Sequence, residues 1–293
     1  MVNLSWLDRP LACLSDPEGF IREEIRIIVC LKPVPDPKYW KNLTIDPVLK
    51  VLVREGMPNV INPLDRNALE EALIIKEGQG GEVIILSMAP LFSLSVLREA
   101  LAIGGDRAIL LSDRAFAGSD TLATSYVLSE AVKRLAPFDL LLCGNETIDG
   151  GTAQVGPQLS QFLGIEGITF ICKIEKSLEG KGKGRSLIVR RKMDHGYLRM
   201  EVKLPALLSV VKEANIPRYA TFMGILEAEK KEILVWNGND LNIDSSRIGL
   251  TGSPTKMSNL FMPELKRRRE IVKGTPEVVS SLIVEKIHQT GLL

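Results

Sequence analysis

The chain has 293 residues, of which 45% are hydrophobic and 25% charged, and its formal net charge is +1. This length suits one large α/β domain with appendages or two small domains, and the composition is that of a globular protein with a sizeable core. The balance of 37 basic against 36 acidic residues argues against a dedicated nucleic-acid-binding protein, which needs a basic excess or a basic stripe.

The cysteines and histidines argue against the usual metal sites. No pair among the four cysteines has Cys-x-x-Cys spacing, and there are two histidines, so we expect no metal site, iron–sulfur cluster or disulfide framework. Cys30 and Cys143 are interpreted as small buried hydrophobic residues at strand ends. No apolar run could cross a membrane, and residues 1–24 lack the apolar core of a signal peptide. We therefore expect no transmembrane segment, a polar N-terminal extension over residues 1–24, and a cytoplasmic location.

Aliphatic runs alternate with helical patterns through the first half of the chain. The expected buried strands cover residues 25–31, 82–88, 108–111 and 138–143. The expected helices cover residues 64–76, 91–103, 121–135 and 152–163. Asn62 is a plausible N-cap of the first helix, with Pro63 in its first position, and Asp120 caps the third. This alternation predicts a doubly wound, mainly parallel, Rossmann-like α/β sheet.

Beyond residue 169 the pattern changes to that of antiparallel strands. Antiparallel strands are expected over residues 170–175, 186–191 and 197–202, with a turn at 180–184, and residues 205–211 form another apolar strand. After residue 240 a Gly/Ser/Pro/Thr-rich stretch predicts an extended arm, and residues 275–289 form an amphipathic helical pattern. The domains are therefore an extension (1–24), an α/β domain with a small antiparallel hairpin region (25–240), and a C-terminal arm plus helix (241–293).

The most informative segment is GNETIDGGTAQVGP, residues 144–157. It follows a buried strand, and ligands of doubly wound sheets bind at the carboxyl ends of the strands. Gly150 and Gly151 let the backbone approach a ligand, Thr152 offers a hydroxyl at the helix start, and free amides there suit a phosphate or pyrophosphate. A turn with an ordinary N-cap and no ligand is the alternative.

A second candidate lies at the start of the third expected helix. Thr121 and Thr124, after Asp120, place two hydroxyls on one face of the first turn, where they suit another part of the same phosphate chain. An ordinary capped helix is the alternative. Neither a P-loop nor a Gly-x-Gly-x-x-Gly fingerprint is present, and no nucleophile–base pattern predicts a catalytic residue.

Four motifs together resemble the electron-transfer flavoprotein β subunit. They are IVCLKPVPD (28–36), NPLDRNALEEAL (62–73), DLLLCGNETIDGGTAQVGPQLSQFLG (139–164) and PRYAT (217–221), in the family's order. The resemblance implies an adenine-nucleotide-binding fold that pairs with an α subunit carrying one FAD. Ordinary β subunits hold AMP, whereas a bifurcating branch holds a second FAD. The strings at 149–157 and 249–255 are similar to the bifurcating branch, so the expected cofactor is FAD, with AMP as the alternative.

The resemblance also implies the site residues. The backbone near residues 30–32 and the Asn62 side chain would frame the adenosine, residues 120–124 would bind the phosphate or ribityl portion, and residues 150–155 would hold the pyrophosphate. The full set is Cys30, Leu31, Lys32, Asn62, Asp120, Thr121, Thr124, Asp149, Gly150, Gly151, Thr152, Ala153, Gln154 and Val155.

A protruding loop after PRYAT is implied to grip a dehydrogenase. Phe222 would be its apolar anchor, with Met223 beside it. The alternative is that Phe222 packs on its own domain. Glu227 and Glu229 stand where the family usually has lysines, which leaves the identity of this partner open.

The function implied is electron transfer between NADH, an acyl-CoA-type or other flavin dehydrogenase, and ferredoxin or flavodoxin, by flavin-based bifurcation within an αβ heterodimer. The arm and helix after residue 240 would pack on the α subunit. NADH oxidation would occur only in the complex, because the flavin carries the redox chemistry and the protein supplies position and electrostatics. The alternatives are an ordinary carrier with structural AMP, a stand-alone ATP-binding stress-type protein, and an assembly subunit with an empty pocket.

Overall fold

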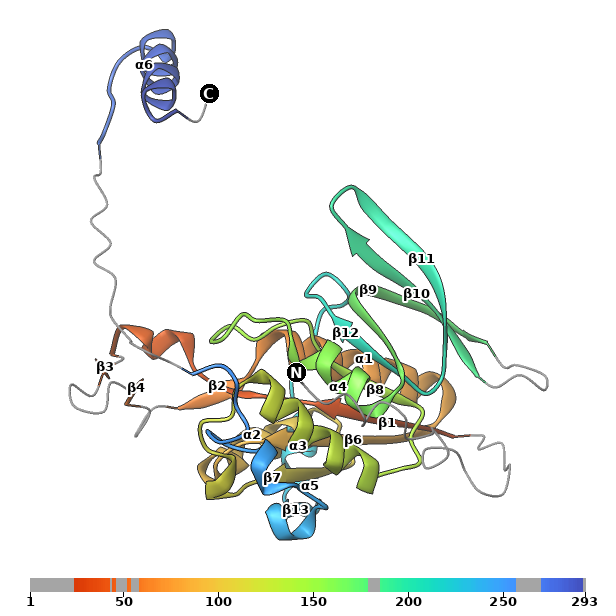
Figure 1. Cartoon of the computed structure of the whole chain (residues 1–293). Helices are drawn as coiled ribbons and strands as arrows, with labels where there is room; N and C mark the ends of the chain where they lie inside the picture. The colour runs from red at the N-terminus through yellow and green to blue at the C-terminus, as the bar shows by residue number, and fades with distance from the viewer. Residues whose placement is uncertain are drawn as a thin grey trace, which may run out of the picture.

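The computed structural model describes residues 24–42, 44–45, 52–53, 58–178, 185–256 and 270–291. Residues 1–23 of the expected extension, and the turn expected at 180–184, lie outside these ranges. Figure 1 shows the chain as a central sheet covered by helices, with a ribbon of strands and a C-terminal helix projecting from it.

Within the described ranges, the main sheet has nine strands in the order β11-β10-β9-β12-β8-β1-β6-β7-β13. Its strands are β1 Ile25–Cys30, β6 Gly81–Met88, β7 Arg107–Leu111, β8 Leu140–Gly144, β9 Glu166–Leu178, β10 Ser186–Met193, β11 Gly196–Lys203, β12 Ala206–Val210 and β13 Ile233–Trp236. Pairing is parallel from β9 to β13 across the sheet, and β10 pairs antiparallel with both β9 and β11. The doubly wound, mainly parallel sheet with an antiparallel hairpin region is therefore confirmed.

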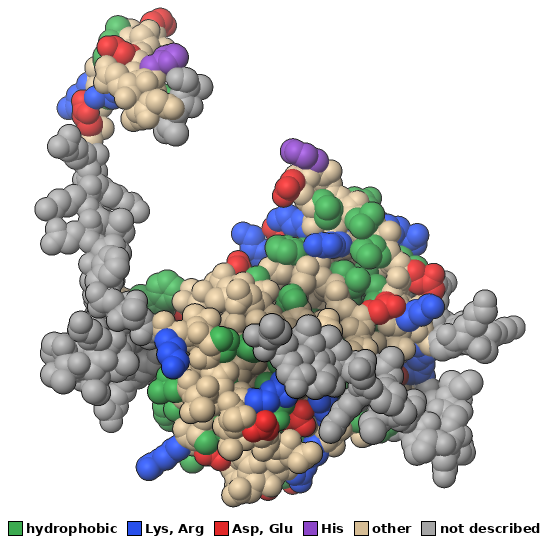
Figure 2. Space-filling model, viewed as in Figure 1, with side chains coloured by type: hydrophobic (Ala, Val, Ile, Leu, Met, Phe, Trp, Pro, Cys, Tyr) green, Lys and Arg blue, Asp and Glu red, His purple; other side chains and the backbone are tan. Residues whose placement is uncertain are grey.

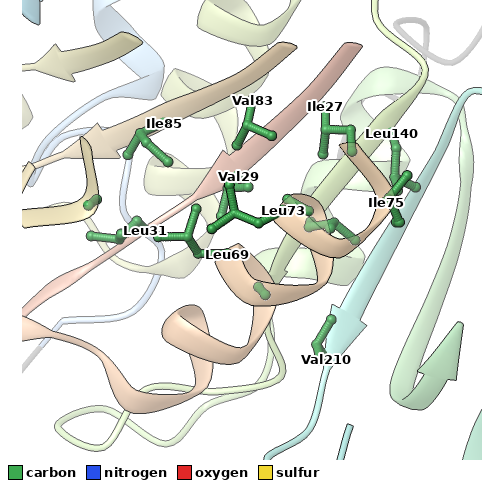
Figure 3. Close-up of a cluster of buried hydrophobic side chains, with 14 of the residues drawn as sticks. Ile27, Val29, Leu31, Leu69, Leu73, Ile75, Val83, Ile85, Leu140 and Val210 are labelled. Carbon is green, nitrogen blue, oxygen red and sulfur yellow. The ribbon is translucent and has the colours of Figure 1, made fainter. Parts of the chain in front are cut away.

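Helices cover both faces of this sheet. They are α1 Pro63–Gln79, α2 Leu94–Ile103, α3 Thr121–Arg134, α4 Val155–Leu163 and α5 Phe222–Ala228, whereas a further helix, α6 Pro276–Gln289, lies away from the sheet. Helices α1, α2 and α5 share one core cluster with the sheet, and α3 and α4 share a second cluster on the opposite face. Figure 3 shows the first cluster, where Leu69 and Leu73 of α1 lie against Val29 of β1. The aliphatic composition of β1 is explained by this, since both faces of the strand are buried.

Short elements fill the connections. They are β2 Pro33–Pro35, which pairs antiparallel with β5 Asn59–Ile61, β3 Thr44–Ile45, which pairs with β4 Leu52–Val53, and the 3-10 helices η2 Pro37–Asn42, η3 Leu91–Ser93, η4 Arg114–Phe116, η5 Gly238–Asp240 and η6 Ser245–Arg247. The loop expected directly after β1 thus contains a short strand. The edge strand β13 and the two small sheets were not predicted from the sequence.

Several boundaries differ from the sequence-based expectation by three or more residues, namely those of α1, α2, α4 and β9. The helix expected from residue 152 begins at Val155, because Gly151 and Ala153 before it adopt left-handed backbone conformations (φ 58° and 53°) that a helix excludes. The strand expected from residue 170 begins at Glu166, where its polar first residue and Gly167 pair with β12.

The C-terminal part has two different sections. Residues 241–256 run along the α/β domain with a 3-10 turn instead of being fully extended, and Leu241 and Ile248 are buried in the second core cluster. The amphipathic helix expected at 275–289 is confirmed as α6, which has no buried residue and stands apart from the α/β domain in Figure 1. The ribbon of β10 and β11 also projects, and its exposed hydrophobic side chains gather near its outer end in Figure 2 (Met193, Tyr197 and Leu198).

Candidate functional site

The winding of the sheet locates the candidate site between β1 and β8. From β1 the chain passes through α1 to β6 on one side, whereas it returns through α3 to β8 on the other side. Doubly wound sheets bind ligands at such a reversal, outside the carboxyl ends of the two strands. The loops there begin at Leu31 and at Gly144, which are the segments singled out in the sequence.

One carboxylate ties these two strand ends together. Asp65, in the first turn of α1, accepts the amide of Lys32 at Oδ2 and the amide of Gly144 at Oδ1, both at 2.8 Å. A side chain at Gly144 would put its Cβ 2.6 Å from Asp65 Oδ1, so this approach requires glycine. Sequence reasoning missed this role of Asp65, although the residue lies inside the motif NPLDRNALEEAL.

Asn62 fixes the next part of the β8 loop. Its Nδ2 donates to the carbonyl oxygen of Glu146 at 2.9 Å, and its Oδ1 accepts the amide of Ile148 at 3.1 Å. The side chain is fully buried and makes no capping hydrogen bond to α1. The expectation that Asn62 caps this helix is therefore wrong, because both of its polar groups are engaged by the loop. Its contact with an adenosine stays a prediction.

The environment of the strand ends is apolar. Burial raises the pKa of Asp65 to about 6, although the amides of Lys32 and Gly144 act in the opposite direction. Burial likewise raises the pKa of the Cys30 and Cys143 thiols, and the negative charge of Asp65 raises both pKa values further. Both cysteines are buried at strand ends, as predicted, and as neutral thiols they offer no nucleophile.

The loop over β8 is closed by an ion pair. Lys32 Nζ lies 2.8 Å from both oxygens of Asp149, which joins the end of β1 to the residue before the two glycines. Burial acts to raise the pKa of Asp149, but the hydrogen bonds and charge of Lys32 outweigh it and hold that pKa below its usual value. The loop then makes a turn, in which the amide of Gly151 donates to the carbonyl oxygen of Thr147 at 2.8 Å. The left-handed Ala153 that follows is an unusual conformation for a residue with a side chain, of the kind found at ligand sites.

The two helix N-termini beside this loop differ in how their amides are used. At α3, Asp120 Oδ1 accepts the amides of Leu122 and Ala123, both at 3.0 Å, which confirms the predicted cap. At α4, the side chain of the N-cap residue Gln154 makes no capping hydrogen bond to the first turn. The first amides of a helix need an acceptor and attract negative charge, so the start of α4 fits a phosphate group better than the start of α3 does.

Side chains join these two helix ends. Thr121 Oγ1 donates to Gln154 Oε1 at 2.8 Å, and Gln158 Nε2 approaches Thr121 Oγ1 at 3.4 Å. Thr124 lies one turn further along α3 and is half-buried. Thr152 precedes α4 by three residues instead of opening it.

The structure brings four of the predicted site residues to one edge of the sheet, namely Lys32, Asp149, Gln154 and Thr121. Cys30 and Leu31 present only their backbone there, because their side chains are buried.

Phe222 and Met223 lie on a separate surface. They begin α5, which packs against α2, with Arg98 of α2 bound to the carbonyl oxygens of Ala228 and Lys231. The Phe222 side chain is 75% exposed, so it does not pack into its own domain. Other exposed hydrophobic residues surround it in sequence, namely Ile216, Tyr219, Ile225 and Leu226. We call this set, with Phe222 and Met223, the apolar loop surface.

The segment that leads to the apolar loop surface is anchored on α1. Arg218 donates to both carboxylate oxygens of Glu70, with its Nε 2.9 Å from Oε2, and also pairs with Glu77. Asn67 donates to the carbonyl oxygen of Asn215 at 3.0 Å, and Asn215 donates back to the carbonyl oxygen of Asn67 at 2.9 Å. Asn67 and Glu70 of α1 are therefore buried beneath this segment and form the seat of the apolar loop surface, which the sequence pattern did not indicate.

The structure also limits other kinds of site. Among the residues that it describes, no group of three or more His, Cys, Asp or Glu side chains is arranged to hold a metal ion. Within the same ranges, no helix has the length and hydrophobicity needed to cross a membrane.

Comparison with known proteins identifies similar chains. The family model described as "Electron transfer flavoprotein domain" matches residues 49–241. The electron transfer flavoprotein subunit beta of Thermoanaerobacterium thermosaccharolyticum is 44% identical over 270 residues, which cover 92% of this chain and 100% of the relative. The caffeyl-CoA reductase-Etf complex subunit CarD of Acetobacterium woodii is 44% identical over 262 residues, covering 88% of this chain and 97% of the relative. Protein FixA of Azorhizobium caulinodans is 39% identical over 251 residues, covering 84% and 87%.

Proposed function

Because the chain belongs to the electron transfer flavoprotein family as a β subunit, we propose that it holds FAD between the ends of β1 and β8 and transfers electrons together with an α subunit. The observation that carries this proposal is the uncapped N-terminus of α4, next to a loop that already turns through two left-handed residues. A dinucleotide's pyrophosphate is the kind of group that such an arrangement accepts.

The residues of this edge have distinct roles in the proposal. The first amides of α4, with Gln154 and Thr152, hold the pyrophosphate, and Thr121 and Thr124 of α3 bind the adjoining phosphate or ribityl oxygens. Asp65 and Asn62 hold the loops after β1 and β8 in place by hydrogen bonds to backbone amides and a carbonyl. Bound flavin would supply the hydride and single-electron chemistry, and the protein positions it and excludes water.

The partners follow from two surfaces. The apolar loop surface around Phe222 binds a flavin dehydrogenase, since exposed aromatic side chains among other apolar ones are typical of binding hot spots. The exposed amphipathic helix α6 packs on the α subunit to form a heterodimer, whereas residues 241–256 of the arm lie against this chain's own domain. The presence of an Etf complex in the name of the CarD relative supports assembly with a reductase. The cytoplasmic location expected from the sequence stays part of the proposal.

Electron bifurcation is the finer part of the proposal. Electrons from NADH would leave in two directions, to the dehydrogenase and to ferredoxin or flavodoxin. The alternative is an ordinary carrier with AMP at the start of α4, which a single phosphate also suits. An anaerobic assay of the αβ complex with its dehydrogenase separates these, because only the bifurcating protein reduces ferredoxin with NADH when the dehydrogenase substrate is present. Ferredoxin that stays oxidised under those conditions would overturn the bifurcating function and leave the ordinary carrier.

A further inference from the structure

The section of the C-terminal arm around residues 249–255 is folded against the first turn of α3. We propose that Ser253 and Thr255 are positioning residues for the nucleotide site, and that they act through Asp120. This inference rests on the proposed function, because it concerns how the same site is held in shape.

Asp120 is shared between the helix and the arm. Its Oδ1 caps α3, while its Oδ2 accepts the amide of Thr255 at 2.9 Å. Its own amide donates to Ser253 Oγ at 2.8 Å. Asp120 is therefore oriented by the arm on two sides, and the cap that it forms depends on the arm being in place.

The arm fits this place closely. The Ser253 side chain is 2% exposed, and its hydroxyl donates to the carbonyl oxygen of Gly249 at 2.6 Å, which closes a tight turn. The amide of Gly249 donates to Ser119 Oγ at 3.1 Å. Gly249 has a φ of +57°, and a Cβ there would lie 2.3 Å from the carbonyl oxygen of Ala115. The turn therefore packs against residues 115–120 without space for a side chain at position 249.

The preceding residues extend the contact along α3. The amide of Asp244 donates to the Tyr126 hydroxyl at 2.9 Å, and the Arg247 guanidinium lies 4.0 Å from the centre of the Tyr126 ring. Ile248 is buried in the core cluster that α3 and α4 share. The arm thus follows α3 from its middle to its N-terminus, where the proposed nucleotide site begins.

A short path connects the arm to that site. Ser253 and Thr255 hold Asp120, the next residue Thr121 donates to Gln154, and Gln154 precedes the uncapped start of α4. If the arm orders this path, nucleotide binding must stabilise the seated arm by the same free energy, because coupling between two sites is reciprocal. The arm is in this sense a part of the nucleotide site.

The test uses the complete αβ complex, stripped of nucleotide and titrated with FAD and, in parallel, with AMP. The variants are Ser253→Ala, which removes the hydroxyl, and Thr255→Pro, which removes the amide at an exposed position. The matched control is Ser246→Ala, whose hydroxyl contacts Asp244 within the same arm but not Asp120. Hydrogen exchange of residues 249–256 is measured with and without the nucleotide that binds.

We expect both variants to weaken nucleotide affinity by about tenfold, which corresponds to the loss of one hydrogen bond of ordinary net strength. Nucleotide should slow exchange in the arm of the wild type and of Ser246→Ala but not of Ser253→Ala, an effect that a merely structural serine would not produce. Thr255→Pro keeps the test decisive if Ser253→Ala fails to fold. Unchanged affinity in the folded variants, with nucleotide bound by the wild type, would overturn the positioning role alone. A wild-type complex that takes up neither FAD nor AMP would overturn the proposed function and this inference together.

Discussion

The amide of Gly144 donates a 2.8 Å hydrogen bond to Asp65, which joins the end of β8 to the first turn of α1. The other oxygen of the same carboxylate accepts the amide of Lys32 at the end of β1. Asp65 thus bridges the ends of two strands that already pair with each other in the sheet, so the site depends on α1 as well as on its own loops.

Replacing Asp65 should change stability in a pH-dependent way. In Asp65→Asn, the new amide group must face a backbone N–H, so we expect the free energy of unfolding to fall by about 1–3 kcal/mol. The pKa of Asp65 is raised to about 6 in the folded protein, so the native state keeps this proton more tightly than the unfolded chain does. The stability from protonated Asp65 is present at low pH and is lost as the pH rises through about 6.

The difference in the free energy of unfolding between the wild type and Asp65→Asn should therefore become smaller as the pH rises from about 4 to about 7. Urea unfolding at each pH measures this difference. The control is Asp113→Asn. Hydrogen bonds from the amides of Ala115 and Gly238 hold the pKa of Asp113 below its usual value. The loss of unfolding free energy in Asp113→Asn, relative to the wild type, should therefore become smaller as the pH falls. Parallel pH profiles for the two variants would contradict the assignment of a raised pKa to Asp65.

The uncapped start of α4 can be tested by adding a charge. Gln154→Glu keeps the size of the side chain and the acceptor for Thr121, but it puts a negative charge beside the first amides of the helix. We expect the affinity of the stripped complex for FAD or AMP to fall by about tenfold or more, because the carboxylate repels a phosphate there. Protein stability should stay equal or rise slightly, since acidic residues suit a helix N-terminus.

Gln161→Glu is the matched control for that variant, because the residue is exposed near the other end of α4. Equilibrium dialysis of both variants gives the comparison. Equal nucleotide affinity in the two would mean that the phosphate does not sit at the start of α4.

The seat of the apolar loop surface should contribute to stability. Arg218→Ala leaves the buried carboxylate of Glu70 without its charged partner, and we expect the free energy of unfolding to fall by about 1–3 kcal/mol. Glu77→Gln, at the exposed end of the same contact, should cost less than about 1 kcal/mol. Urea unfolding of both variants checks this order, and a larger effect of Glu77→Gln would contradict the role given to Glu70.

Phe222 should matter to partner binding and not to nucleotide binding. We expect Phe222→Ala to weaken binding to the dehydrogenase by about thirtyfold, as for a hot-spot residue, with unchanged nucleotide content. Phe92→Ala is the matched control. Phe92 is also exposed, but it lies just before the N-terminus of α2 and outside the apolar loop surface. The measurement is the dependence of electron-transfer rate on dehydrogenase concentration. Equal effects of the two substitutions would remove the assignment of this surface.

The main features of the fold were predictable because they follow from local patterns. The aliphatic runs of β1, β6, β7 and β8 are buried on both faces, and Asp120 caps α3 as its type and place indicate. Tertiary choices were not predictable. Asn62 stands at a helix start, where a side chain can bond either the helix or a neighbouring loop, and only the folded structure shows that it bonds the loop.

The same limit applies to the site. The loop at 144–154 was found because glycines and a following helix are adjacent in the sequence. In contrast, the contact between Arg218 and Glu70 joins residues 148 positions apart, and Ser253 reaches Asp120 across 133. Polar pairs at such separations leave no periodic signal, so the seat of the apolar loop surface and the arm's part in the site came from the structure.

The most direct test of the central claim is the nucleotide content of the purified αβ complex, denatured and quantified by chromatography. The account predicts about two FAD and no AMP per heterodimer, with one FAD at the ends of β1 and β8 of this chain. One FAD and one AMP per heterodimer would contradict the FAD assignment and make this chain the β subunit of an ordinary electron carrier.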